Sequence, residues 1–332
     1  MRASRMLSNG TIVCRGARLA LLLVVATLLA CGSATGGTGG QASASPQVAA
    51  AESAPHQPHA TTTTVGHHNM NDPNDQRLSA YKQQIGWDQL KEPGHARGGV
   101  AAVWPAIDKA PVFSAGSWRL IFDKTVFLPG VVQREWVLRQ QRENVSVRVA
   151  VSSDGWEAAR RHFLAAVSST SMMTIPYRRS ATPIGALSVE NMAASGGAVI
   201  WIFRNVCFDV RAHDSDVDVR ALASWLQQHA SQAVVDDLAP QRPPLERIEL
   251  SDKTVTVGAE FSAKLWFRPG GATVDDYVFS FNNDATRLDL LEETHDTVRC
   301  RALARGRAAV TVRVANRATL LAAAIATDIV VQ

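Results

Sequence analysis

The hydrophobic pattern of this sequence changes at Pro243-Pro244, and this change constrains the fold more than any other feature. Two adjacent prolines interrupt helices and strand ladders because proline has no backbone N–H to donate. Before this point helical and strand-like periods alternate, and after it only short strand-like segments remain. We therefore predict an α+β domain over residues 76–240 and an all-β domain over residues 241–332.

The α+β domain is predicted to hold one antiparallel sheet with helices on one face. Two strand-like segments, 144–151 and 205–210, each lead through Ser or Asp into a segment with helical spacing, which begins near Trp156 and Val219. Two ββα halves would explain this internal similarity. The stretch from Ala198 to Arg211 is interpreted as one strand of a hairpin. Its predicted apolar face comprises Ile200, Ile202, Val206, Phe208 and Val210.

The C-terminal domain is predicted to be a β-sandwich, because apolar and polar residues alternate in segments such as 261–267 and 310–314. Segments 245–258 and 298–312 resemble the opening and penultimate strands of bacterial Ig-like (BIG-type) domains, in which a glycine precedes an alternating A-x-V-x-V run. Gly306 is at that position, whereas Arg305 stands where the family commonly has proline. The resemblance implies an Ig-like sandwich used for adhesion, spacing or sugar binding, without one fixed activity.

The N-terminal segment has the pattern of an export signal over residues 1–30. Arginines but no acidic residues precede an uncharged run from Leu19 to Ala30, which is too short to span a bilayer. The following Leu28-Leu29-Ala30-Cys31 resembles the lipobox of bacterial lipoproteins. That resemblance implies cleavage before Cys31, acylation of its thiol, and attachment to the bacterial cell membrane or outer membrane. An ordinary cleaved signal or an uncleaved anchor is the alternative.

Residues 31–75 are predicted to form a lipidated, disordered tether, because Gly, Ala, Ser, Thr, Pro, Gln and His dominate and large apolar residues are scarce. Four histidines in this segment are weak candidates for metal ligands: His56, His59, His67 and His68. No carboxylate or cysteine completes a spaced set with them, so polar filler is the simpler interpretation.

Charge and cysteine content exclude several classes of function. The four arginines of the signal account for the whole formal net charge of +4, so the remaining chain has no basic excess to bind nucleic acid. Only Cys207 and Cys300 remain beyond Cys31, which is not a disulfide framework or a metal pair. We expect Cys300 inside the sandwich, Cys207 partly exposed, and no bridge between them.

The sequence contains no catalytic motif that we can place in a suitable context. His162 follows Arg160 and Arg161 and is expected to be solvated, while the aspartates after His213 are expected to cap a helix rather than bind a cation. We therefore predict no catalytic residue and no cofactor. The expected function is a lipid-anchored envelope module that binds a protein or polysaccharide partner. The alternatives are an envelope enzyme of unrecognised type, or a scaffold or assembly factor for an envelope complex.

Overall fold

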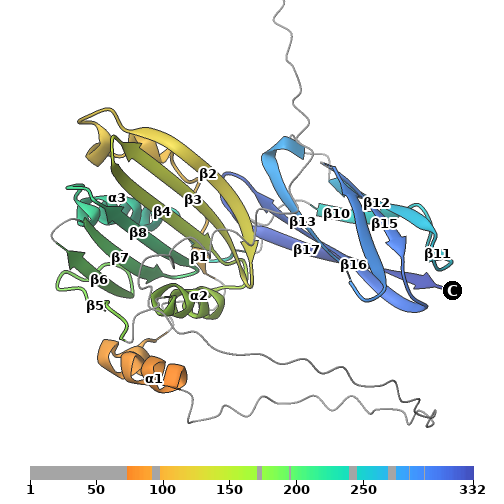
Figure 1. The fold of residues 1–332 in the computed structure, drawn as a ribbon, viewed down its shortest axis with the longest axis horizontal. Helices are drawn as coiled ribbons and strands as arrows, with labels where there is room; N and C mark the ends of the chain where they lie inside the picture. The colour runs from red at the N-terminus through yellow and green to blue at the C-terminus, as the bar shows by residue number, and fades with distance from the viewer. Residues whose placement is uncertain are drawn as a thin grey trace, which may run out of the picture. The chain divides into compact units, whose positions relative to one another are not determined.

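A computed structural model describes residues 73–91, 98–169, 174–193, 196–238, 245–267, 274–283, 285–294 and 296–332. This part of the chain is mostly β-strand, with three α-helices and several sheets. The largest sheet has seven antiparallel strands in the order β2-β3-β4-β8-β7-β6-β5 (Figure 1). Its strands are β2 (Arg119–Leu128), β3 (Val131–Gln140), β4 (Glu143–Val151), β5 (Arg178–Arg179), β6 (Leu187–Ala193), β7 (Gly196–Phe203) and β8 (Val206–His213).

Helices cover both faces of this sheet, so the prediction of helices on one face was wrong. Helix α3 (Val219–Gln232) packs with Val149 and Phe208, whereas α2 (Trp156–Ser168) packs with their neighbours Ala150 and Cys207. Successive strand residues point to opposite faces, so the two helices lie on opposite sides (Figure 1). The order ββα does occur twice, as β3-β4-α2 and β7-β8-α3, but the two helices pack on opposite faces, so the two segments are not related by a rotation within one sheet.

The stretch from Ala198 to Arg211 forms two strands, which corrects the predicted single strand. The chain turns at Arg204-Asn205, where Arg204 has φ 51°. Asn205 is buried and holds the turn: its Oδ1 accepts from the Val100 N–H at 2.6 Å, and its Nδ2 donates to the Ser152 carbonyl at 2.9 Å. The turn places Ile200 and Ile202 on the α2 face, opposite the face that carries Val206, Phe208 and Val210.

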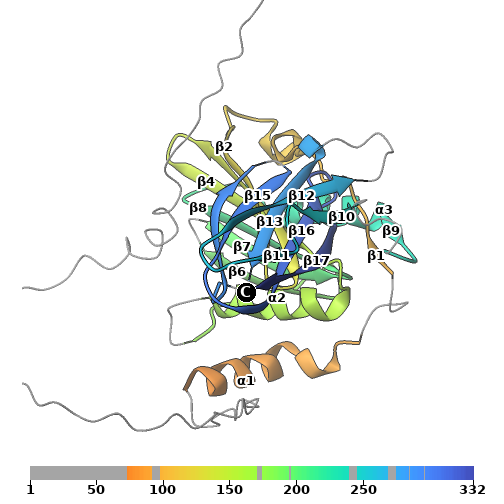
Figure 2. The ribbon, with the colours of Figure 1, turned by 90° about the vertical axis from the view of Figure 1, so that its right-hand side faces the viewer.

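Helix α1 (Pro73–Ile85) packs on the α2 side of the sheet. Its Tyr81 and Ile85 are buried in the same apolar cluster as α2, and the following Trp87 stacks on Phe163 at 5.8 Å between ring centroids. Both views show α1 beside α2 (Figures 1 and 2). A two-stranded sheet of β1 (Gly99–Val100) and β9 (Val234–Val235) adds to the α3 side. No described helix is long and apolar enough to cross a bilayer.

The C-terminal residues form two four-stranded sheets around one apolar core, as the alternation of residues predicts. One sheet contains β10 (Leu245–Leu250), β12 (Glu260–Phe267), β15 (Thr297–Ala302) and β14 (Leu288–Glu293). The other contains β11 (Thr254–Val255), β17 (Ala322–Val331), β16 (Gly306–Asn316) and β13 (Tyr277–Asn283). Cys300 lies in the core between them, which confirms its predicted burial.

The turn between β16 and β17 belongs to the core of the larger sheet as well. Leu320 and Leu321 are fully buried in the α3-side cluster, and the Ala322 N–H donates to the Ser153 hydroxyl at 2.6 Å. The Trp104 N–H also donates to the Ala318 carbonyl at 2.9 Å. The two predicted domains therefore share apolar contacts, which a change of periodicity cannot reveal.

Candidate functional site

The candidate site lies on the α2 face of the large sheet, where apolar residues give way to charged ones. Strand alternation brings Glu135 of β3, Arg148 of β4 and Asp209 of β8 into adjacent register positions across three neighbouring strands. Together with α2 they line a cavity of about 290 Å³. Its lining residues are Gln133, Glu135, Arg148, Ala150, His162, Ala165, Ala166, Ser169, Cys207 and Asp209.

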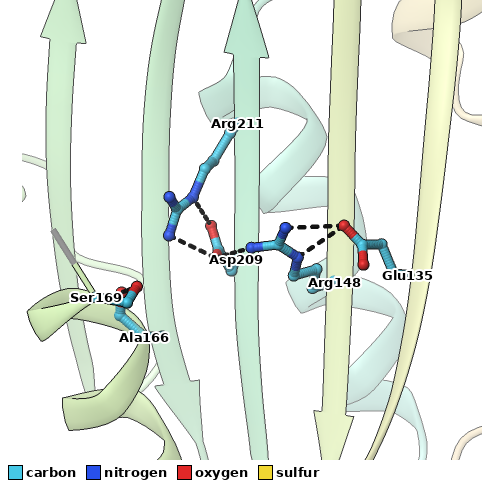
Figure 3. A network of polar contacts seen from close by, with 6 residues as sticks. All are labelled: Glu135, Arg148, Ala166, Ser169, Asp209 and Arg211. Carbon is cyan, nitrogen blue, oxygen red and sulfur yellow. Dashed lines mark hydrogen bonds and ion pairs between the residues drawn. The ribbon is translucent and has the colours of Figure 1, made fainter. Parts of the chain in front are cut away.

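The charged side chains form one continuous network (Figure 3). Arg148 donates to the Glu135 carboxylate through Nε at 2.9 Å and approaches Asp209 through Nη1 at 3.4 Å. Arg211 binds Asp209 with two parallel hydrogen bonds of 2.8 Å from Nε and Nη2. Asp209 therefore lies between two guanidinium groups, and Arg148 lies between two carboxylates.

This network balances its own charge in a partly desolvated place. The Asp209 side chain is only 7% exposed, so ionisation there requires close cationic partners. Burial alone would lower the pKa of Arg211, but hydrogen bonds and charge from Asp209 outweigh burial and raise this pKa. The Arg211 guanidinium also lies 5.9 Å from the centre of the buried Tyr177 ring. Two positive and two negative side chains thus leave the network without net charge.

His162 projects from α2 into this cavity, so the prediction that it is solvated was wrong. Its side chain is half-buried. Burial lowers the pKa of His162, an effect that Asp209 opposes and Arg148 reinforces. The imidazole is consequently neutral at pH 7, with one nitrogen able to donate a hydrogen bond and the other able to accept one.

Cys207 forms part of the cavity floor but is unsuited to nucleophilic chemistry. It is 2% exposed, which corrects its predicted partial exposure and follows from the turn at Asn205. Burial and, secondarily, the charge of Asp209 raise its pKa well above the ordinary value. A thiolate is the nucleophilic form of cysteine, so this protonated thiol acts as a small apolar side chain. Both Cys207 and Cys300 are free and buried.

The structure places the other predicted sites as follows. Cys31, His56, His59, His67 and His68 lie outside the described residues. Asp218 confirms the predicted capping by accepting hydrogen bonds from the Arg220 and Ala221 N–H groups, and His213 is exposed. Within the described ranges, no group of three or more His, Cys, Asp or Glu side chains could hold a metal ion.

A larger cavity of about 610 Å³ lies along α1, but it is a weaker candidate. Every residue that lines it among those described belongs to α1 itself, so it does not bring together side chains from separate elements. The cavity beside α2 instead combines three strands and a helix. Sequence reasoning missed its charged residues because each one, taken by itself, reads as an outward-facing polar position of an amphipathic strand.

Comparisons with known proteins leave the family open. A scan against family models finds no matching family, and a search of curated proteins finds no matching relative. Among solved structures, the chain is similar to a polysaccharide lyase with 8% identity and a TM-score of 0.19. It is also similar to the gamma-CGTase from alkalophilic Bacillus clarkii with 10% identity and a TM-score of 0.17. These matches cover 66% and 68% of this chain but only 34% and 27% of the other chains.

Proposed function

We propose that this chain is a lipid-anchored cell-envelope protein that acts by binding a partner and not by catalysis. The Leu28-Leu29-Ala30-Cys31 sequence after a short apolar run supports the anchor. The polar cavity beside α2 supports binding, because it combines a small concave volume with hydrogen-bonding groups from several elements.

The observation that carries the non-catalytic part of the proposal is the mutual neutralisation of the charged network. General acid–base catalysis needs a group that exchanges a proton with the substrate near the working pH. Asp209 accepts two short hydrogen bonds from Arg211, and Glu135 accepts from Arg148, so both carboxylates are engaged by guanidinium groups of the protein itself. Two possible nucleophiles line the cavity: the Cys207 thiol, which is buried and protonated, and the Ser169 hydroxyl, which donates to the Ala166 carbonyl at 2.8 Å. Among the described residues that line the cavity, His162 remains for proton transfer, and its side chain makes no hydrogen bond to a carboxylate of these residues.

We further propose that residues 245–332 are an Ig-like domain of the BIG type that extends the binding domain or adheres to envelope material. Two sheets around a shared core support this assignment, as does Gly306, which begins β16 with φ 129°. That φ is far easier for glycine than for other residues, in agreement with the glycine of the resembling motif.

A scaffold role is a second candidate, and the β2 edge of the large sheet favours it. Leu120, Ile121 and Phe122 are 41–47% exposed on a strand that pairs only with β3 among the described residues. Exposed apolar edge strands are suited to pairing with another chain.

Site-specific photocrosslinking in native membranes tests these candidates together. A photoreactive residue at Ala165 reports on the cavity, one at Ile121 reports on β2, and one at the exposed Asp252 serves as the control. Mass spectrometry of the adducts should identify a partner at Ala165. Adducts at Ile121 alone would favour the scaffold, and a lack of specific adducts at both positions would contradict the binding proposal.

Membrane attachment is tested with Cys31→Ala. We expect this variant to leave the membrane fraction or to accumulate as an uncleaved precursor, because the thiol that accepts the lipid is missing. Cys14→Ala, within the same signal, is the matched control and should behave as the wild type. An unchanged size and unchanged membrane retention of Cys31→Ala would defeat the lipoprotein assignment.

A further inference from the structure

We infer that the cavity beside α2 binds an uncharged sugar residue. The inference rests on the proposed binding function and adds the chemical class of the ligand. Three properties of the cavity lead to it: its charge balance, its unused hydrogen-bonding groups and its apolar wall.

The charge balance excludes ions as good ligands. An anion would compete with Glu135 and Asp209 for Arg148, which would leave a partly buried carboxylate without its partner. A cation at the free oxygen of Glu135 would lie beside the Arg148 guanidinium, which repels it. His162 adds no charge at pH 7, because burial lowers its pKa. A neutral ligand leaves every existing ion pair in place.

The unused polar groups require a ligand with both donors and acceptors. Gln133 and His162 line the cavity, and neither side chain makes a hydrogen bond within the described residues. Each of them presents a donor and an acceptor. Glu135 binds Arg148 through Oε1 only, as Figure 3 shows, so its Oε2 is a further acceptor. Hydroxyl groups, which donate and accept, match this set.

The remaining wall consists of small side chains, which are apolar except for Ser169. Ala165 and Ala166 from α2 face the cavity that Ala150 and Cys207 line from the sheet. A sugar ring has polar edges and C–H faces, so it can contact the alanines while its hydroxyls reach Gln133 and His162. The volume of about 290 Å³ is at the lower end of ligand pockets, which suits one ring better than a folded peptide segment.

Saturation-transfer NMR on the full chain, purified in a sugar-free detergent, tests the inference. The probes are glucose, galactose and N-acetylglucosamine, with glucuronate as the anionic and glucosamine as the cationic comparison. We expect a neutral sugar to bind and the charged ones to bind at least about tenfold more weakly. Gln133→Ala and His162→Ala should each weaken binding by about threefold to tenfold. Ala165→Phe, which fills the cavity without removing a polar group, should abolish it.

The exposed His213→Ala is the matched control and should bind as the wild type does. Preferred binding of glucuronate or glucosamine would overturn the neutral ligand class. Absence of sugar binding together with a peptide partner crosslinked at Ala165 would overturn the sugar while leaving the binding function intact. Absence of both would overturn the proposed function itself. Equal sugar binding by wild type and Ala165→Phe would place the sugar elsewhere and refute this site.

Discussion

The two faces of the seven-stranded sheet are built from alternate residues of the same strands, yet they differ in chemistry. The α3 face buries one large apolar cluster, which contains stacked Trp201 and Phe208 with ring centroids 4.4 Å apart. At β6 the same face holds the buried Glu190, which is paired with Arg220 of α3. The α2 face is apolar beneath the helix and then becomes a charged network beside a cavity. The α3 face therefore buries the larger apolar cluster, whereas part of the α2 face exposes polar groups to a cavity.

Phe208→Ala should have the largest effect on stability, because Phe208 is fully buried on the apolar face. We expect the free energy of unfolding to fall by about 3–5 kcal/mol, which combines lost burial with a residual cavity. Urea denaturation of the purified chain measures this change. A loss below about 1 kcal/mol would mean that the α3 face repacks easily and is not the stabilising face.

Asn205→Ala should have the next largest effect on stability, because the turn at Asn205 determines which residues of β7 and β8 lie on each face of the sheet. The substitution removes its hydrogen bonds with Val100 and Ser152, whose backbone groups stay buried. We expect a loss of about 2–3 kcal/mol in urea denaturation. Asn144→Ala, an asparagine whose bonds are at the surface, is the control and should change stability by less than about 0.5 kcal/mol. Equal losses in both variants would contradict this role of the turn.

Asp209→Asn, on the charged α2 face, should lower the free energy of unfolding by about 2 kcal/mol. The change leaves Arg211 without its carboxylate, but the partial exposure of both arginines keeps the cost below that of a fully buried pair. Chemical denaturation at low and high salt measures it. Glu260→Gln on the sandwich, where the carboxylate is 40% exposed and also pairs with two arginines, should show no comparable loss. A similar loss of stability in both variants would mean that the network stabilises the fold no more than ordinary surface ion pairs do.

His162 should make a small, pH-dependent contribution to the free energy of unfolding. Its pKa in the folded state is lowered from 6.5, so the unfolded state binds more protons as the pH falls below about that value. The stabilising effect of keeping this imidazole neutral is present above pH 6.5 and is lost as the pH falls toward the folded pKa. Urea midpoints between pH 5 and 7.5 should therefore fall more steeply in the wild type than in His162→Gln. Parallel curves would show that His162 is solvated after all.

Sequence patterns determined much of the local structure of this protein. Alternation at every second residue predicted strands such as β4 and β16, and helical spacing after Ser152-Ser153-Asp154 predicted α2, because these periods report directly which side chains must leave water. The burial of Cys300 followed from the same alternation within one strand. Export and lipidation stay predictions from local sequence, and they concern residues outside the described part.

Tertiary structure alone decided how these elements combine into a site. The turn at Asn205 depends on hydrogen bonds to Val100, 105 positions away, so no local pattern could have separated β7 from β8. If that turn is not recognised, alternation predicts that Cys207 is exposed. Alternation also cannot show that Asp209 lies opposite Arg148 on the neighbouring strand. The cavity exists because β8 joins the consecutive elements β3, β4 and α2, and its Asp209 lies 61 positions from its partner Arg148. Periodicity gives each strand its two faces, but only long-range contacts determine what each face meets.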